Sequence, residues 1–231
     1  MKSSLIKPHE FFLFTGPMFS GKTRDMLTYT LKFDDHNIRK DDKFKIKYIC
    51  FKPEFEKGDG PFIVSRGYKG QNIIKKPAHL IPDSNPRKML DIYSLASKKD
   101  VIDAVVIDEP QFFNEGICDV VDDFKNEGLM VLASGLLFDY THNYFGPMGE
   151  LLKHATEIFM STATCSMNNC IIPATHTQRL IASTREPAPL GELKIVKNKD
   201  FGKINTEAEF DYEPRCFKHF VHPSTVLAYY K

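Results

Sequence analysis

The sequence carries no excess of charge, no long apolar run and few cysteines. It has 31 Lys and Arg against 30 Asp and Glu, so its net charge of +1 favours neither nucleic acid nor an acidic membrane as a partner. No apolar run approaches the ~20 residues that a membrane-spanning helix needs. Five cysteines in a chain of 231 residues are no secreted disulfide framework, and clustered cysteines in a reducing compartment indicate a metal site. Cys50 and Cys118 fall within a strand pattern and a helix pattern, and we expect both in the core.

Targeting and repetitive segments are also missing. The first residues, MKSSLIKPHEFFLF, have no signal-peptide core because Pro8, His9 and Glu10 interrupt it. We therefore expect a cytoplasmic protein. There is no internal repeat or low-complexity tract, and the length suits one α/β domain with or without a small appendage.

Apolar runs and helical patterns alternate through the first two thirds of the chain. The predicted strands are 10–15, 44–51, 62–64, 101–107 and 129–134, and the predicted helices are 22–31, 90–97 and 116–126. Such alternation indicates an α/β fold with a mostly parallel sheet covered on both faces. The pattern fades near Ala155, and we expect a nucleotide-binding α/β domain over residues 1–157 and a smaller zinc-binding domain over 158–231.

The eight residues GPMFSGKT satisfy the G-x-x-x-x-G-K-[ST] pattern of a phosphate-binding loop (P-loop), between a predicted strand and a predicted helix. Glycine lets backbone N–H groups approach phosphate oxygens, and the helix N-terminus adds its positive end. Lys22 is expected to reach the β- and γ-phosphates and the Thr23 hydroxyl to bind Mg²⁺. The residues predicted to surround the ATP phosphates are Gly16, Pro17, Met18, Phe19, Ser20, Gly21, Lys22 and Thr23.

A pair of acids follows the predicted strand AVVIDE. Asp108 stands at its carboxyl end, where a Mg²⁺-associated carboxylate belongs in a P-loop protein. Glu109 comes next and is the candidate general base. Such a base activates water and a substrate hydroxyl equally well, so these residues leave the phosphate acceptor open.

Two pairs of metal-ligating side chains lie near the C-terminus. Cys165 and Cys170 are five residues apart, and Cys216 and His219 are three apart. Two chelating pairs separated by a long insert are typical of structural zinc, because four protein ligands leave no open coordination position. Spacing alone leaves His222 open as the fourth ligand. It also leaves open that Cys165 and Cys170 are ordinary buried thiols and not metal ligands.

Five stretches in the same order resemble the zinc-containing, type II thymidine kinase family, and the resemblance covers the chain from about residue 11 to 220. They are GPMFSGKT, DEPQFF (108–113), GLLFDYTHNYFG (135–146), ATCSMNNCIIPATHTQRL (163–180) and YEPRCFKHF (212–220). The resemblance implies a P-loop core with a C-terminal zinc-ribbon and lasso domain. It also implies transfer of the ATP γ-phosphate to the 5′-hydroxyl of thymidine, with other pyrimidine deoxynucleosides open as substrates.

The resemblance assigns roles to individual residues. Glu109 matches the catalytic base, with Lys22 as the second catalytic residue, and Asp108 and Gln111 join the ATP and Mg²⁺ site. The residues matching the nucleoside side are Met18, Phe112, Tyr140, Phe145, Leu193, Lys194, Ile195, Val196, Lys197 and Tyr212. The implied cofactors are ATP, Mg²⁺ and structural Zn²⁺. The implied partners are other copies in a homotetramer or dimer and dTTP as a feedback inhibitor, with no nucleic acid and no membrane.

Some positions depart from the family pattern. Leu137, Thr141 and Tyr144 replace an Asp, an Arg and a Pro, and His219 replaces the last Cys. Three alternatives stay open: a P-loop ATPase whose zinc module binds nucleic acid or protein, a GTP-binding switch, and an inactive relative. The ATPase alternative needs a basic, aromatic-rich face, which the charge total does not support. A GTP-binding switch needs the guanine-recognition motif Asn-Lys-x-Asp. Residues 198–200 read Asn-Lys-Asp and lack the residue x between Lys and Asp.

Overall fold

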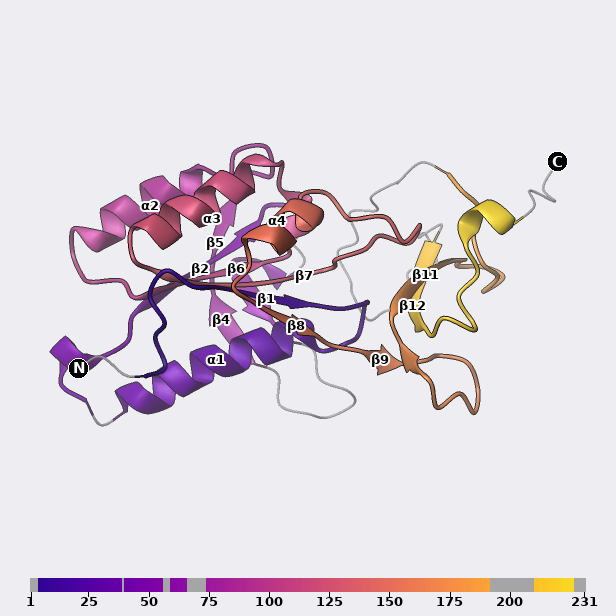
Figure 1. Cartoon of the computed structure of the whole chain (residues 1–231), viewed down its shortest axis with the longest axis horizontal. Helices are drawn as coiled ribbons and strands as arrows, with labels where there is room; N and C mark the ends of the chain where they lie inside the picture. Colours follow the sequence, from indigo (N-terminus) through magenta and orange to yellow (C-terminus); the bar gives the residue numbers. More distant parts are fainter. Residues whose placement is uncertain (1–3, 39, 56–58, 66–73, 192–209, 227–231) are drawn as a thin grey trace.

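A six-stranded sheet with helices on both faces forms the larger part of the structure (Figure 1). The computed structural model describes residues 4–38, 40–55, 59–65, 74–191 and 210–226. The helices are α1 (Lys22–Asn37), α2 (Lys88–Ser97), α3 (Gly116–Asn126) and α4 (Met148–His154), with short 3-10 helices η1 (Asp42–Phe44), η3 (Pro110–Phe112) and η4 (Pro223–Thr225). The strands are β1 (Phe11–Thr15), β2 (Tyr48–Pro53), β3 (Phe62–Val64), β4 (Lys75–Pro77), β5 (His79–Ile81), β6 (Ala104–Asp108), β7 (Met130–Gly135), β8 (Glu157–Met160), β9 (Ala163–Thr164), β10 (Pro173–Ala174), β11 (His176–Ile181) and β12 (Phe210–Arg215).

The strands of the central sheet run in the order β5-β2-β6-β7-β1-β8, and every neighbouring pair is parallel. The predicted α/β fold is therefore confirmed. Parallel strands place all their carboxyl ends at one edge of the sheet, which is where α/β proteins bind nucleotides. No helix among the described residues is both long and apolar enough to cross a membrane.

Each face of the sheet has its own core because side chains alternate along a strand. Phe11 and Leu13 of β1 point to the face that α2, α3 and α4 cover, and they pack with side chains such as Phe124 of α3. Phe12 and Phe14 point to the face of α1 and pack in a second cluster. Figure 1 shows the two helical layers on opposite sides of the strands.

Several predicted elements have different bounds, and two of the differences have clear local reasons. The helix predicted to end at residue 31 continues to Asn37, because Phe33 extends its buried stripe. The strand predicted from residue 44 begins at Tyr48 instead. The Asn37 side chain bonds both the N–H and the C=O of Ile46, at 2.8 Å each, and these groups are then not available for a ladder at that residue.

The sequence pattern predicts neither α4 nor β8. α4 has only 7 residues, too few to establish a helical period. β8 is an edge strand, and its Ile158 and Met160 side chains are 45% and 67% exposed. The predicted division between residues 157 and 158 remains a prediction, and β8, which pairs with β1, lies across it.

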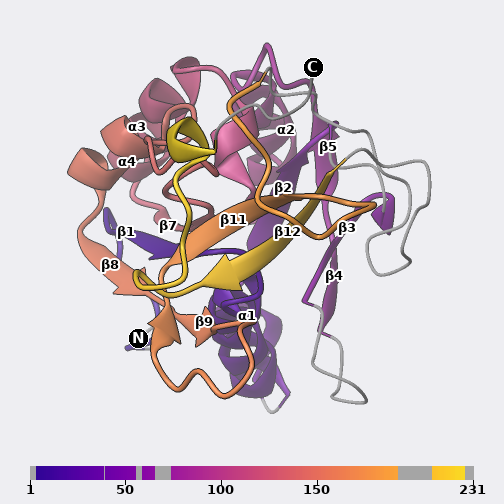
Figure 2. The same cartoon turned by 90° about the vertical axis from the view of Figure 1, so that its right-hand side faces the viewer.

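A smaller C-terminal module, comprising β9 to β12 and the turns around them, lies beside the carboxyl edge of the sheet (Figure 2). β9 pairs with β10, and β11 pairs with β12, both antiparallel. A row of rings connects the module to the loop after β7. His142 of that loop stacks on His176 of β11 at 4.1 Å between centroids, and His176 stacks on Phe220 at 4.5 Å.

This stack predicts a pH dependence of stability. Burial lowers the pKa of His142 and of His176 below 6.5. His142 lowers the pKa of His176 further, while at His142 the Asp139 carboxylate opposes the shift and His222 adds to it. The unfolded chain therefore binds more protons as pH falls through about 6.5, so stability is lost on acidification. We expect the thermal midpoint to fall between about pH 7.5 and 5.5, and His176→Phe to flatten this profile. The same profile in His176→Phe and wild type would contradict the assignment, and His36→Phe, outside the stack, is the control.

Candidate active site

The P-loop connects β1 to α1 at the carboxyl edge of the sheet. Gly21 has φ 85° and Phe19 has φ 62°, so the backbone makes left-handed turns just before the helix begins at Lys22. Gly16 passes so close to the Ser161 carbonyl that any Cβ would clash with it. The Lys22 side chain is buried at 7% exposure. These turns and the following helix are backbone features that a phosphate cradle needs.

Three hydroxyl and carboxylate groups meet beside the P-loop. The Thr23 hydroxyl donates to Asp108 Oδ1 at 3.3 Å and lies 3.2 Å from the Ser134 hydroxyl. Asp108 and Ser134 are adjacent in the register of β6 and β7, which explains why they converge. Two oxygens bound side by side to one Mg²⁺ lie about 3 Å apart, since each bond is about 2.1 Å. The Thr23–Asp108 pair therefore fits a Mg²⁺ site.

Glu109 has an unusual backbone and a defined hydrogen-bond partner. Its φ of 50° and ψ of 48° are left-handed, although it is not glycine, and its N–H donates to the Ser134 carbonyl at 2.7 Å. Strain of this kind clusters at functional sites. The Gln111 side-chain amide donates to the Glu109 carboxylate and accepts from the Leu136 N–H at 3.2 Å. Gln111, which the sequence assigns to ATP and Mg²⁺, thus holds the candidate base in the described structure.

Gly135 allows Gln111 to occupy this position. A Cβ on Gly135 would clash with Gln111 Oε1 and lie 2.9 Å from Pro110 Cδ. We expect Gly135→Ala to displace Gln111 and to lower kcat about 10- to 100-fold, the range that follows from misplaced catalytic groups. Steady-state kinetics measures this. An unchanged kcat in Gly135→Ala would contradict the prediction.

Aromatic rings predicted to hold the nucleoside lie near the carboxyl edge. Phe112 makes an edge contact with Phe145 at 5.4 Å between centroids, and its other neighbour is Phe55 at 4.9 Å. Tyr140 is 5% exposed, and its hydroxyl donates to the Gly191 carbonyl at 2.8 Å. Tyr212 lies on β12 of the C-terminal module. The predicted segment Leu193–Lys197 lies outside the described residues.

The C-terminal module touches the P-loop directly. The Met18 N–H donates to the Thr177 hydroxyl of β11 at 3.1 Å. This bond joins Met18 of the P-loop to the module, while its double role in phosphate and nucleoside binding stays a prediction.

The four predicted metal ligands converge. Their ligand atoms all lie within 4.8 Å of one another. Cys170 Sγ is 3.7 Å from Cys216 Sγ, and His219 Nδ1 is 3.6 Å from Cys165 Sγ and 3.3 Å from Cys216 Sγ. Bonds of about 2.3 Å to a tetrahedral zinc would place sulfurs about 3.8 Å apart, so this cluster fits Zn²⁺.

The chemistry of the cluster also suits a metal. Burial raises the pKa of the Cys165 thiol, but hydrogen bonds from the Cys216 and Met167 amides and from His219 together lower it to about 6. A lowered pKa favours the thiolate, which is the form that binds metal. His222 is engaged elsewhere: its ring nitrogens lie 2.7 Å from the Ser224 hydroxyl and 3.0 Å from the Thr141 carbonyl. The geometry thus favours His219 as the fourth ligand.

The other two cysteines are in the core, as predicted. Cys50 and Cys118 are 5% and 6% exposed, and burial raises the pKa of the two thiols to about 12 and about 11. Both therefore stay protonated near neutral pH and are inert.

The sequence matches the family model described as thymidine kinase over residues 10–220. The chain belongs to the thymidine kinase family. A protein named thymidine kinase from Metamycoplasma arthritidis is 32% identical over 206 residues, which cover 88% of this chain and 86% of that protein. Thymidine kinases from Aster yellows witches'-broom phytoplasma and Ureaplasma parvum are each 32% identical, over 88% and 73% of this chain and 83% and 68% of their own lengths.

Two residues of this thymidine kinase family member have site contacts that the sequence analysis does not assign. Ser134 is the residue before the last of β7 and lies beside Asp108, and the rule that selects carboxyl ends of strands would have selected it too. Thr177 lies within the family-like stretch THTQRL, but nothing in the sequence shows that its hydroxyl reaches the P-loop.

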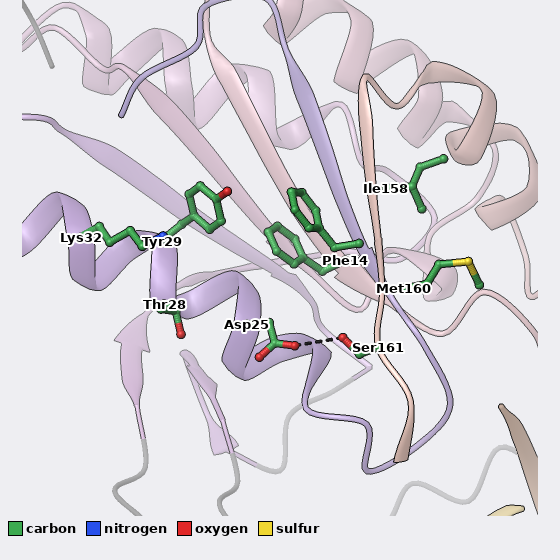
Figure 3. Close-up of a pocket in the computed structure, with 9 residues that line it drawn as sticks. Phe14, Asp25, Thr28, Tyr29, Lys32, Ile158, Met160 and Ser161 are labelled. Carbon is green, nitrogen blue, oxygen red and sulfur yellow. Dashed lines mark hydrogen bonds between the residues drawn. The ribbon is translucent and has the colours of Figure 1, made fainter. Parts of the chain in front are cut away.

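A cavity of about 530 Å³ lies between α1 and β8 (Figure 3). Phe14 and Tyr29 line it, and Ser161 donates to Asp25 at 2.9 Å along its wall. Its described lining includes none of the residues predicted to bind ATP or nucleoside. The candidate active site of this thymidine kinase family member therefore lies at the carboxyl edge of the sheet and not in this cavity.

Proposed function

We propose that the protein transfers the γ-phosphate of ATP to the 5′-hydroxyl of thymidine, with Glu109 as the general base. The observation that carries this proposal is the placement of Glu109, held by Gln111, directly after Asp108 and beside the P-loop. A base at this position serves a hydroxyl acceptor that approaches the γ-phosphate from the sheet edge. The family and its named relatives support thymidine as that acceptor.

In the proposed mechanism, each of these side chains has a defined step. Lys22 and the amides of the P-loop bind the β- and γ-phosphates. Thr23 and Asp108 would hold Mg²⁺, which supplies charge neutralisation at the phosphates. Glu109 takes the proton of the 5′-hydroxyl as its oxygen bonds to the γ-phosphorus, and the bond to the β–γ bridging oxygen breaks to release ADP.

The zinc cluster has a structural role in this proposal. Cys165, Cys170, Cys216 and His219 would fill all four positions of Zn²⁺, leaving none for substrate. We propose that residues 158–231 form the domain that covers the nucleoside, with Met18, Phe112 and Phe145 as its opposing wall. Phe and Tyr rings suit the flat faces of a thymine base.

A product assay tests the proposal. Purified protein is incubated with ATP and Mg²⁺ and with each of the common nucleosides in turn. We expect a monophosphate from thymidine and none from purine nucleosides. ADP release without any nucleoside would support the ATPase alternative, and no product under any condition would support an inactive relative.

Assembly, regulation and location are separate parts of the proposal. The resemblance supports a homotetramer or dimer, feedback inhibition by dTTP and a cytoplasmic location. Sedimentation measures the first, and inhibition by dTTP at subsaturating thymidine measures the second. A monomer or a dTTP-insensitive enzyme would remove these parts without affecting the proposed reaction.

A further inference from the structure

One face of β11 lies against the candidate active site. Thr177 and Arg179 are two residues apart on this strand, so their side chains point to the same face. Thr177 accepts the hydrogen bond of the Met18 N–H in the P-loop. Arg179 therefore extends from the same face, toward the nucleoside side of the site. None of the roles described above uses it.

Arg179 is the largest of the fully buried side chains described, with 1% exposure. Its guanidinium carbon lies 3.7 Å from the centroid of the Tyr140 ring and 4.5 Å from that of Phe210. Its Nη2 donates to the Pro189 carbonyl at 2.6 Å. A planar cation over two aromatic rings, with a directed hydrogen bond, is an arrangement that Lys does not reproduce.

The same side chain connects both tyrosines predicted on the nucleoside side. Arg179 faces Tyr212 directly across the β11–β12 pair. Burial raises the pKa of the Tyr212 phenol, and the nearby Arg179 charge lowers it in part, consistent with close contact between the two groups. Tyr140 is held from one side by the Arg179 guanidinium and at its hydroxyl by the Gly191 carbonyl.

We propose that Arg179 is a positioning residue for nucleoside binding, which it serves by holding Tyr140, Tyr212 and the 189–191 turn in place before the nucleoside arrives. The inference rests on the proposed function. Groups held rigidly in advance bind their ligand without an ordering cost, so loosening them weakens binding of that ligand alone. ATP phosphates bind to the P-loop, which Arg179 does not contact among the interactions described.

Arg179→Lys tests this inference, because it keeps the charge and removes the planar stack. We expect the KM for thymidine to rise ~10-fold, the size of one lost stacking and hydrogen-bonding arrangement, with the KM for ATP and the zinc content unchanged. Arg179→Ala should raise the thymidine KM further. If Arg179→Ala does not fold, the Lys variant alone decides.

Arg185→Lys is the matched control, since Arg185 follows β11 in the same module but pairs with Asp211 and Glu213 at 2.5 and 3.0 Å, and its side chain is 54% exposed. It should behave as wild type. An unchanged thymidine KM in Arg179→Lys would overturn the inference. So would a parallel rise in the ATP KM or a loss of zinc, which a general structural role predicts.

Thymidine binding to the wild type distinguishes failure of this inference from failure of the proposed function. Calorimetric titration of thymidine into wild type and Arg179→Lys accompanies the kinetics. Thymidine binding without phosphorylation would refute the proposed function while the affinity difference still tests Arg179. No thymidine binding to wild type would overturn both.

Discussion

Replacing Glu109 by Gln should lower kcat for thymidine phosphorylation about 10²- to 10⁴-fold, the usual contribution of a general base. The amide has nearly the same shape as the carboxylate but cannot accept the proton of the 5′-hydroxyl. Gln111, which donates to Glu109, can donate in the same way to the new carbonyl oxygen, so the local structure should persist. The KM for ATP should change little because the P-loop is not altered. Quenched-flow or steady-state assays of nucleoside monophosphate measure the effect.

Glu115→Gln makes the same chemical change at an exposed residue just before α3 and should be silent. A Glu109→Gln enzyme with wild-type kcat would refute the base assignment. A loss of thermal stability in step with the loss of activity would also count against it, since it would indicate a folding defect.

Replacing Cys216 by Ser should remove the zinc and destabilise the C-terminal module. Cys216 is fully buried, and its sulfur contacts both Cys170 and His219. Metal binding of this kind is coupled to folding, and we expect a loss of at least ~3 kcal/mol, or roughly 6–12 °C in thermal midpoint. Zinc content by atomic emission and a melting curve measure the two effects.

Cys118→Ser is the matched control because Cys118 is also buried but lies in α3, outside the cluster. It should keep its zinc. A full zinc content in Cys216→Ser would refute that ligand. The pair His219→Gln and His222→Gln separates the two candidate histidines, with zinc lost only in the first.

Zinc removal should also weaken thymidine binding. Cys216 follows β12 directly, and β12 pairs with β11 along its length. β11 carries Thr177, which contacts Met18, and Arg179, which contacts Tyr140, so a loosened metal cluster weakens both contacts.

The sequence alone predicted the features that depend on local order. An apolar strand, a Gly-rich turn and a helix follow one another at GPMFSGKT, and all three appear as β1, the P-loop and α1. The parallel sheet follows from alternating strands and helices, which is a property of order along the chain. The ligand spacing of Cys165, Cys170, Cys216 and His219 likewise predicted a cluster that the structure brings together.

Other features depend on residues far apart in sequence, and they become visible only in the folded chain. β8 joins the sheet through pairing with β1, although its exposed residues give no strand pattern. The Gln111 side chain reaches Glu109 because Gly135, on another strand, leaves room for it. His222 is excluded from the metal cluster by its contact with Thr141. The Arg179 guanidinium of β11 lies over the ring of Tyr140, which belongs to the loop after β7. Local pattern thus determined which groups this protein carries, while the long-range approach of strands and loops decided which of them act together, because contacts between distant residues have no period along the sequence.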